Sequence, residues 1–453
     1  MKLADVHTVH FVGIGGIGMS AIARFMHLKG KVVSGYDRTR TALTDALEAE
    51  GMAIGYEADP ARLKGIDLVV YTPAVPDSHA ELAEARRCNM PLMKRAEVLG
   101  MISRAYRTIA IAGTHGKTTT TGLTAYLLRS CGVDATAFIG GISQNFNSNF
   151  VYGESEWVVV EADEFDRSFL QLKPDVAVIT SVDPDHLDIY GNEESVLSGF
   201  RDFAGQILPG GTLFINDRAV RLDPEAVHTD AYGLGEGEIR ALNVEFKPEG
   251  TTFDYQSPAH SLTGLNIPFP GQYNLENAMA AISVAKLVGV DDELLRDALA
   301  NAKGVQRRFD IRYDEGDLRV VDDYAHHPEE IRAVLNAVRS QYGTDRKLIA
   351  VFQPHLYSRT QDFYPGFAEA LSIADEVLLL DIYPAREEPI EGVSSDLIYD
   401  LLTVERKGRC TLGDTAHALS AFQASPAVVM VMGAGDIDTQ VAAVVNEVQT
   451  WKQ

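Results

Sequence analysis

The chain has 453 residues, and its 40 Lys and Arg against 64 Asp and Glu give a net charge of −24. At roughly 100 to 200 residues per domain, this length predicts about three domains. The excess of acidic residues excludes a surface that works by neutralising nucleic-acid phosphates or anionic lipid, and 46% hydrophobic residues exclude wholesale disorder.

The cysteines and the apolar segments limit the cellular context. Cys88, Cys131 and Cys410 lie far apart and show no metal-ligand spacing, so neither a disulfide framework nor a zinc ribbon is expected. The first ten residues lack the apolar core of a signal peptide, and no apolar run reaches the roughly 18 residues that a membrane span needs. We therefore expect a soluble cytoplasmic protein.

Apolar runs typical of strands alternate with helix-like stretches along almost the whole chain, which favours an α/β fold with parallel sheets. The runs that predict buried strands cover residues 8–12, 67–71, 108–112, 157–160, 176–180, 348–352, 377–380 and 428–432. A helix-like stretch ends near residue 103, and a basic segment before residue 310 precedes new strand signals. We expect three domains, with residues 1–103, 104–309 and 310–453.

The first glycine motif, Gly13 to Gly18, follows the strand at 8–12 and opens a helix. It matches G-x-G-x-x-G in the context that this motif requires, where glycines let the backbone and a helix N-terminus approach a diphosphate. Asp37 follows the next strand at about the distance of a ribose-binding acid. Two interpretations remain open on this pattern alone: a nucleotide diphosphate site, with NAD as the first guess, and a tight structural turn.

The second glycine motif, Gly113-Thr-His-Gly-Lys-Thr-Thr119, lies between the strand at 108–112 and a helix from about Thr120. Its Gly-Lys-Thr core supplies backbone donors for phosphate oxygens, an ammonium for the β- and γ-phosphates and a hydroxyl for Mg²⁺. Ile111 stands where the usual P-loop has its first glycine. The order of strand, loop and helix nevertheless predicts an ATP-type phosphate site.

Acidic side chains follow the next two strands. Glu161 begins the sequence Glu-Ala-Asp-Glu, and Asp183-Pro-Asp-His186 follows the strand at 176–180. A phosphate-bound Mg²⁺ takes one or two protein carboxylates, and an acid at a neighbouring strand end can supply one. The alternative is that these acids are charges at helix starts. We expect Glu161 to be a metal ligand.

The chain thus carries two phosphate-binding turns on separate predicted domains. A dehydrogenase needs only the first turn. An ATP-driven ligase that joins a nucleotide-linked substrate to a second molecule needs both.

The motifs resemble those of the Mur ligases, occur in the order of that family and span nearly the whole chain. The segments that carry the resemblance begin at His10 (HFVGIGGIGM), Gly113 (GTHGKTTTT), Glu161 (EADE), Asp183 (DPDH), Tyr273 (YNLENA), Arg307 (RRF), Asp322 (DDYAHHP), Phe352 (FQPH), Asp381 (DIYPA) and Gly433 (GAGDI).

The resemblance implies a Rossmann-like N-terminal domain for a UDP-sugar, a central P-loop ATPase domain and a Rossmann-like C-terminal domain for an amino acid. It implies an ATP-dependent amide ligase that adds L-alanine to UDP-N-acetylmuramate through an acyl phosphate, in peptidoglycan synthesis and hence in cell shape and division. ATP and Mg²⁺ are the implied cofactors. The implied partners are small-molecule substrates, and we expect a monomer or weak homodimer without nucleic acid or membrane partners.

Site residues follow from the family's motifs position by position. The residues for the UDP-sugar are Gly15, Gly16, Ile17, Gly18 and Met19, to which the spacing adds Asp37. The residues for ATP are Gly113, Thr114, His115, Gly116, Lys117, Thr118, Thr119, Asn277, Arg308 and Asp322. The implied metal ligands are Thr118, Glu161 and His186, and the implied catalytic residues are Lys117, Glu161 and His186. The residues facing the amino acid are Tyr324, His326, His355 and Arg359.

Some positions depart from the family pattern. Several relatives have a lysine that is carbamylated to bridge a second metal, whereas this chain has Phe200-Arg201 in that neighbourhood, which argues against a carbamate site. Leu356 and Arg386 stand where the family has Arg and Gly. Arg359 is therefore the main candidate for the amino-acid carboxylate, because a guanidinium binds carboxylates in a bidentate fork.

Other interpretations remain for single residues and for the whole chain. His326 and His327 could cap a helix that begins at Pro328, and Arg359 could be a surface partner of Asp362. The alternative functions are a peptide-adding ligase of the same family, a nicotinamide oxidoreductase and a non-catalytic nucleotide-regulated binding module.

Overall fold

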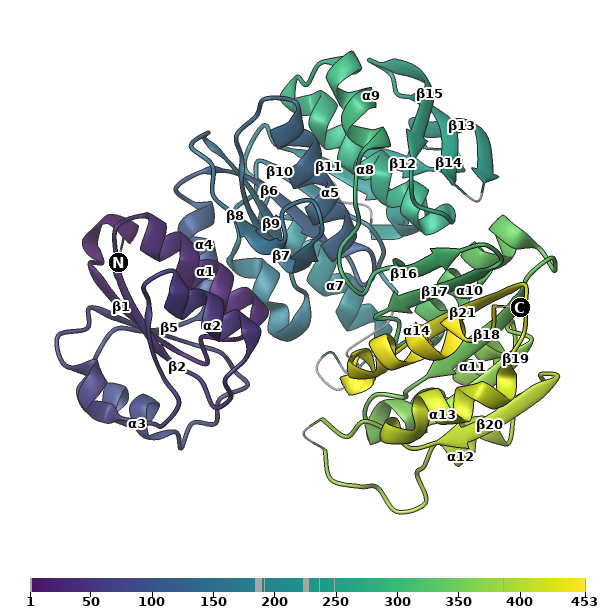
Figure 1. The fold of residues 1–453 in the computed structure, drawn as a ribbon. Helices are drawn as coiled ribbons and strands as arrows, with labels where there is room; N and C mark the ends of the chain where they lie inside the picture. Colours follow the sequence, from purple (N-terminus) through teal and green to yellow (C-terminus); the bar gives the residue numbers. More distant parts are fainter. Residues whose placement is uncertain are drawn as a thin grey trace. The chain divides into compact units, whose positions relative to one another are not determined.

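The computed structural model describes residues 2–183, 190, 192–222, 228–235, 237–247, 249–385 and 387–452 (Figure 1). Residue contacts group the chain into two compact units. Unit 1 holds Met1–Leu242, Asp254–Thr263 and Glu276–Ala302, and unit 2 holds Asn243–Phe253, Gly264–Leu275 and Lys303–Gln453. The two tryptophans of the chain are both buried, Trp157 in unit 1 and Trp451 in unit 2. No helix in the described part is both long and apolar enough to span a membrane.

The first sheet is parallel throughout, with the strand order β3-β2-β1-β4-β5. Its strands are β1 (Thr8–Val12), β2 (Val32–Tyr36), β3 (Ala53–Gly55), β4 (Leu68–Tyr71) and β5 (Leu92–Lys94). The accompanying helices are η1 (Leu3–Asp5), α1 (Ile17–Leu28), α2 (Ala42–Ala49), η2 (Pro60–Leu63), α3 (Ala80–Arg87) and α4 (Arg95–Ser103). This is the strand order of the first five strands of a Rossmann fold, in which ligands bind where the strand order reverses, beside the turn after β1.

The second sheet has the strand order β15-β14-β13-β12-β11-β10-β6-β9-β7-β8. Its strands are β6 (Arg107–Ala112), β7 (Thr136–Ser143), β8 (Ser148–Val151), β9 (Trp157–Glu161), β10 (Val176–Ile179), β11 (Thr212–Asn216), β12 (His228–Gly233), β13 (Ile239–Lys247), β14 (Gly250–Gln256) and β15 (Ser261–Ile267). Its helices are α5 (Lys117–Ser130), η3 (Phe165–Gln171), α7 (Glu193–Ala204), η4 (Asp217–Leu222), α8 (Gln272–Val288) and α9 (Asp292–Ala300). Strand β6 pairs in parallel with both β10 and β9, so the loops that follow these three strands meet at one edge.

Within unit 1, α1 also packs against the β7–β8 hairpin. The ring of Phe25 in α1 lies 5.5 Å from that of Phe138 and 6.4 Å from that of Phe150. The side-chain amide of Asn149 donates to the carbonyl of Ile17 at the start of α1. These contacts join the first turn and the C-terminal half of α1 to the central sheet.

The third sheet has the strand order β16-β17-β21-β18-β19-β20, in which only the β16–β17 pair is antiparallel. Its strands are β16 (Asp310–Glu315), β17 (Leu318–Asp323), β18 (Lys347–Phe352), β19 (Glu376–Leu380), β20 (Arg406–Cys410) and β21 (Ala427–Met432). Its helices are α10 (Pro328–Tyr342), α11 (Tyr357–Leu371), α12 (Asp396–Tyr399), η5 (Leu412–Asp414), α13 (Thr415–Leu419), η6 (Ser420–Phe422), η7 (Asp436–Gln440) and α14 (Val441–Gln449).

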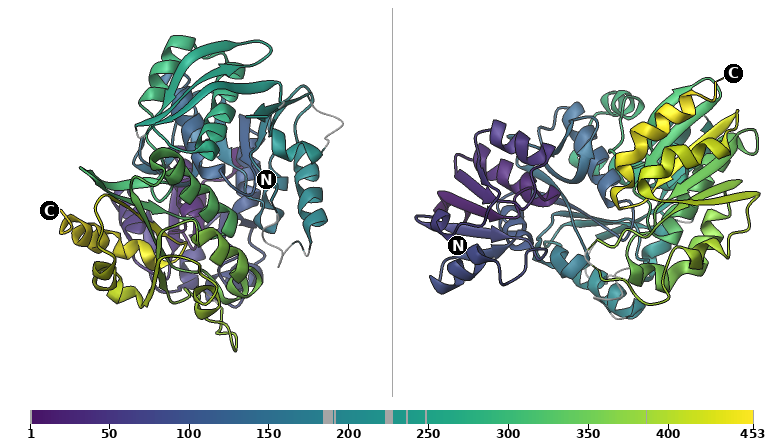
Figure 2. Two further views of the ribbon diagram at one scale, coloured as in Figure 1. Left: turned by 90° about the vertical axis from the view of Figure 1, so that its right-hand side faces the viewer. Right: turned by 60° about the horizontal axis from the view of Figure 1, so that its bottom comes forward.

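Helices cover both faces of this third sheet. In β18, Ala350 and Phe352 pack with α10 and α11, whereas Ile349 and Val351 pack with α13 and α14. In Figure 2 the yellow helices lie on one face of this sheet and the green helices on the other. The alternation explains why the strand reads as a continuous apolar run, since both of its faces are buried.

The structure confirms the α/β class and the eight strands predicted by range, with ends within one residue, and the strand before Asp37 ends two residues later than predicted, at Tyr36. The helix after the second glycine motif begins at Lys117, earlier than expected, because Gly116 takes a left-handed conformation with φ of +81° and ends the loop there. The three sheets occupy residues 8–94, 107–267 and 310–432. We propose domain boundaries after residues 103 and 309, between these sheets.

Candidate active site

The loop between β6 and α5 has the backbone of a phosphate-binding turn. Gly113 and Gly116 have φ values of +134° and +81°, in the region that L side chains rarely adopt. A Cβ at Gly113 would lie 2.0 Å from Thr180 Oγ1, and a Cβ at Gly116 would lie 2.5 Å from Asn277 Oδ1. Both positions therefore require glycine, and the loop presents the first N–H groups of α5, which have no partner within the helix.

The ammonium of Lys117 is turned onto this loop and pairs with an acid. It donates to the carbonyls of Gly113 (2.7 Å) and Thr114 (3.1 Å) and lies 2.8 Å from Oε2 of Glu164. Burial acts to lower the pKa of Lys117, but the carboxylate of Glu164 and two neighbouring acids outweigh burial and raise that pKa. Burial raises the pKa of Glu164 against the opposing effect of Lys117. Lys117, the predicted phosphate-binding residue, therefore lies folded onto the loop as the partner of Glu164.

Two oxygen ligands lie side by side next to the loop. The hydroxyl of Thr118 donates to Oε1 of Glu161 at 3.0 Å, and the N–H of Gly140 donates to Oε2 at 2.8 Å. Burial raises the pKa of Glu161, and Lys117 opposes this shift. A half-buried carboxylate beside a hydroxyl suits a hard cation such as Mg²⁺, which keeps several waters and needs few protein ligands.

The described residues do not contain a cluster of three or more His, Cys, Asp or Glu side chains that could hold a metal by themselves. His186, the third predicted ligand, lies outside the residues that the structure describes. Of the three predicted metal ligands, the described residues therefore include Thr118 and Glu161.

The remaining predicted ATP residues of unit 1 surround the same loop. The hydroxyl of Thr114 donates to the carbonyl of Asp183 at 2.8 Å, and the N–H of His115 donates to Ser181 Oγ at 2.9 Å. Asn277 of α8 accepts from the hydroxyl of Thr120 at 3.1 Å. Thr119 lies in the first turn of α5. The structure therefore gathers residues that are more than 150 positions apart in the sequence, since Thr120 and Asn277 are separated by 157 positions.

The N-terminal glycine turn is held by Asp37. The N–H of Gly15 donates to Oδ2 of Asp37 at 2.7 Å, and a Cβ at Gly15 would lie 2.8 Å from the same oxygen. Gly16 is the N-cap of α1, and Ile17, Gly18 and Met19 form its first turn. The predicted UDP-sugar residues are thus adjacent, with Asp37 bound to the backbone of the turn.

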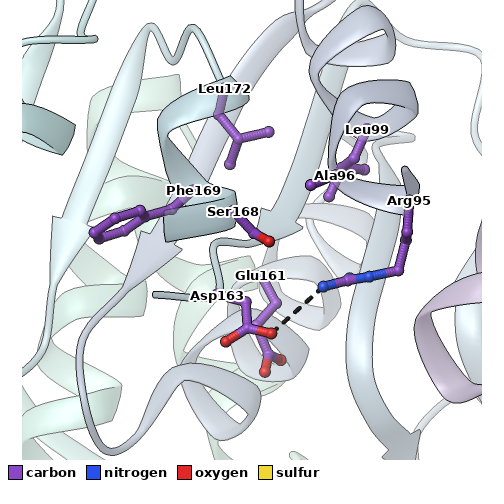
Figure 3. Close-up of a pocket in the computed structure, with 8 residues that line it drawn as sticks. All are labelled: Arg95, Ala96, Leu99, Glu161, Asp163, Ser168, Phe169 and Leu172. Atoms are coloured by element: carbon purple, nitrogen blue, oxygen red, sulfur yellow. Dashed lines mark hydrogen bonds and ion pairs between the residues drawn. The ribbon is translucent and has the colours of Figure 1, made fainter. Parts of the chain in front are cut away.

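Arg95 was missed by the sequence analysis. A Cβ at Gly18 would lie 2.8 Å from its Nη1, so the guanidinium covers the start of α1. Its Nη2 donates to Oδ2 of Asp163 at 3.4 Å. Figure 3 shows Arg95 directed toward Asp163 beside Glu161, in a pocket that is also lined by Ala96, Leu99, Ser168, Phe169 and Leu172. Its position directly after β5 could have indicated a role in binding, because parallel sheets bind ligands at the carboxyl ends of their strands.

In unit 2, the residues predicted to face the amino acid gather at the ends of β17 and β18. The ring of His326 lies 5.2 Å from that of Tyr324 and 6.0 Å from that of His355, and Arg308 lies 4.9 Å over Tyr324. Burial, together with the charges of Arg359 and Arg308, lowers the pKa of His326 to about 4, and Glu330 partly opposes this shift. His326 is therefore neutral at neutral pH, and the cations of this group are arginines.

The neighbouring residues His326 and His327, both predicted as possible helix caps, differ in their contacts. His327 is the N-cap of α10 and accepts from the N–H of Glu329, so the capping interpretation is confirmed for His327. His326 is instead held by the carbonyl of Tyr324, which lies 2.8 Å from its Nδ1. Arg359 lies in the first turn of α11, and Arg386 falls outside the described residues.

Asp322 lies at the end of β17 with a side chain that is almost fully buried. Its Oδ1 lies 3.8 Å from Nε of Arg307. Burial raises the pKa of Asp322 to about 7, and burial raises that of the adjacent Asp323 to about 6. This strand end therefore holds two acids that change charge near neutral pH.

Lys117 of the P-loop and the Thr118–Glu161 oxygen pair lie at neighbouring strand ends, and a second glycine turn lies in the same unit. These features define the protein as an ATP-dependent ligase with a P-loop. The chain belongs to the Mur ligase family. Models for the "Mur ligase family, catalytic domain", the "Mur ligase middle domain" and the "Mur ligase, glutamate ligase domain" match residues 8–107, 111–285 and 307–435.

Individual proteins are similar over nearly the full length. The UDP-N-acetylmuramate–L-alanine ligase of Phocaeicola vulgatus is 45% identical over 97% of this chain and 98% of its own. The protein of the same name from Porphyromonas gingivalis is 45% identical over 98% of this chain and 99% of its own. The crystal structure of the UDP-N-acetylmuramate-alanine ligase of Thermotoga maritima aligns with a TM-score of 0.82 and 28% identity, covering 98% of this chain and 100% of that one.

A murein peptide ligase from Psychrobacter arcticus shares the fold, with a TM-score of 0.70 and 22% identity over 98% of each chain. These matches give no support to a nicotinamide oxidoreductase or to a non-catalytic binding module.

Proposed function

We propose that this chain joins the amine of L-alanine to the lactyl carboxylate of UDP-N-acetylmuramate at the expense of ATP, in the synthesis of peptidoglycan precursors. The observation that carries this proposal is the P-loop of unit 1, where Lys117 and the Thr118–Glu161 pair meet at adjacent strand ends. Relatives with this printed activity at 43–45% identity over nearly the whole chain support the choice of substrates.

The chemistry requires that the carboxylate be activated. A carboxylate is a poor electrophile, and transfer of the γ-phosphoryl group of ATP converts it to an acyl phosphate with phosphate as leaving group. The amine of alanine then attacks, and the products are the amide, ADP and phosphate. Lys117 supplies a charge that stabilises the transferred phosphoryl group. Thr118, Glu161 and His186 are the proposed ligands of Mg²⁺, which when bound neutralises charge on the phosphate oxygens.

We further propose the binding residues for each substrate. Gly15, Gly16, Ile17, Gly18 and Met19 hold the UDP-sugar, and Asp37 contributes by ordering their turn. Asn277, Arg308 and Asp322 contact ATP, together with residues 113–119. Tyr324, His326, His355 and Arg359 face the amino acid. We propose a cytoplasmic enzyme that acts on these small molecules as a monomer or weak homodimer.

The test is the release of ADP by purified protein with ATP, Mg²⁺ and UDP-N-acetylmuramate plus alanine, glycine, serine or a tripeptide in separate reactions. We expect alanine to give the highest rate, with ADP and phosphate as products. Release of AMP and pyrophosphate would contradict the acyl-phosphate route. A higher rate with the tripeptide would assign the chain to the peptide-adding members of the family.

A further inference from the structure

The position of Lys117 conflicts with phosphate binding. An ammonium group has three donors, and those of Lys117 are directed to the carbonyls of Gly113 and Thr114 and to the carboxylate of Glu164. The two carbonyls belong to the loop that surrounds a phosphate in the proposed ATP site. To contact the β- and γ-phosphates, the lysine has to give up part of this arrangement.

The main chain of Glu164 is fixed in place, and its side chain is buried. Its side chain is 3% exposed, and its carbonyl accepts from the hydroxyl of Tyr190 at 2.7 Å and from the N–H of Arg167 at 2.9 Å. Asp166 and Arg167, which come next, have φ values of +52° and +53°, so the chain turns sharply after Glu164. The main chain at Glu164 is thus held in place, and the buried carboxylate has little room to move with the lysine.

We propose that Glu164 is a positioning residue that competes with the phosphates of the nucleotide for Lys117. In the free enzyme Glu164 keeps the ammonium of Lys117 folded onto the loop, and nucleotide binding draws the ammonium away from Glu164. The inference rests on the proposed ATP site and adds a residue that acts through Lys117 rather than on the substrate.

A change of affinity follows from this competition. Removing the negative charge at position 164 leaves the half-buried Lys117 without its acid, which raises the free energy of the free protein. In the nucleotide complex the phosphates supply that charge, so the complex is affected less. A variant that destabilises the free state more than the bound state binds its ligand more tightly.

The experiment measures ADP binding in the presence of Mg²⁺ by calorimetry. We expect Glu164→Gln to bind ADP at least about fivefold more tightly than the wild type, which is the lower end of typical coupling effects. The melting temperature of the free variant should fall and its increase on adding ADP should be larger. Adenosine, which lacks phosphates, should bind both proteins equally.

Three further variants separate the role of the lysine from other effects of the substitution. In a Lys117→Ala background, Glu164→Gln should leave the dissociation constant for ADP unchanged, since the competition is then absent. Glu164→Asp retains the charge and should keep an affinity closer to the wild type, and it remains measurable if the Gln variant does not fold. Asp166→Asn is the matched control, because Asp166 lies in the same turn but pairs with Lys94 at 3.1 Å.

Unchanged or weaker ADP binding in Glu164→Gln would overturn the inference, as would an equal effect of Glu164→Gln in the Lys117→Ala background. Both results leave the proposed function intact if the wild-type protein forms the alanine amide. Failure of the wild type to bind ADP would instead contradict the proposed ATP site.

Discussion

Arg359 lies in the first turn of α11, in a unit where the neighbouring His326 is neutral at neutral pH. A guanidinium stays charged at every working pH and binds a carboxylate with two parallel hydrogen bonds. Arg359 is therefore the side chain that we expect to hold the carboxylate of alanine, while a neutral His326 can accept a hydrogen bond from its amine.

We predict that Arg359→Ala raises the KM for alanine at least about tenfold, equivalent to roughly 1.4 kcal/mol. The KM values for ATP and UDP-N-acetylmuramate should change far less. Steady-state ADP release with each substrate varied in turn measures all three, and Arg346→Ala, a change to an arginine stacked on Tyr342, is the control. Equal increases in KM for all three substrates would show that Arg359 does not bind the amino acid specifically.

At the scale of the element, the end of β17 holds more ionisable charge than a buried strand normally carries. Asp322 is 1% exposed and Asp323 is 4% exposed. The pKa of Asp322 is raised from 3.8 to about 7, so the folded protein binds more protons than the unfolded chain between those pH values. The contribution of Asp322 to stability is therefore present below about pH 4 and is lost as the pH rises to about 7.

We predict that Asp322→Asn gains free energy of unfolding relative to the wild type as the pH is raised from about 4 to about 7, by at most roughly 4 kcal/mol. Urea denaturation followed by circular dichroism at several pH values measures this difference. Asp317→Asn, at an exposed position in the turn before β17, is the control. Parallel pH profiles for Asp322→Asn and the wild type would contradict the buried, protonated state.

The elements themselves could be predicted because parallel strands with two buried faces appear as continuous apolar runs. Helix starts were less predictable, since the start of α5 depends on the left-handed conformation of Gly116. The side-chain pairings could not be predicted. The sequence groups Glu161, Asp163 and Glu164 as one acidic cluster, but β9 ends and the chain turns there, so the three acids meet Thr118, Arg95 and Lys117 respectively.

At the scale of the whole molecule, the net charge of −24 opposes the approach of the proposed substrates, which are all anionic or carry a carboxylate. Binding must therefore depend on a few local cations. In the described part of unit 1, Lys117 and Arg95 are each held by an acid, and the two pairs lie on the same segment after β9. Cations that are paired in this way remain charged without making the surface basic.

The separation of the two tryptophans makes each compact unit observable by its own fluorescence. Trp157 begins β9, the strand that ends at Glu161, and its ring lies 4.0 Å under the guanidinium of Arg107, while Trp451 is buried beside α14. In Trp451→Phe the emission reports unit 1, and in Trp157→Phe it reports unit 2. A ligand stabilises the state that binds it, so ADP should raise the unfolding midpoint of the Trp157 signal more than that of the Trp451 signal. A shift confined to the Trp451 signal would place the main nucleotide contacts in unit 2.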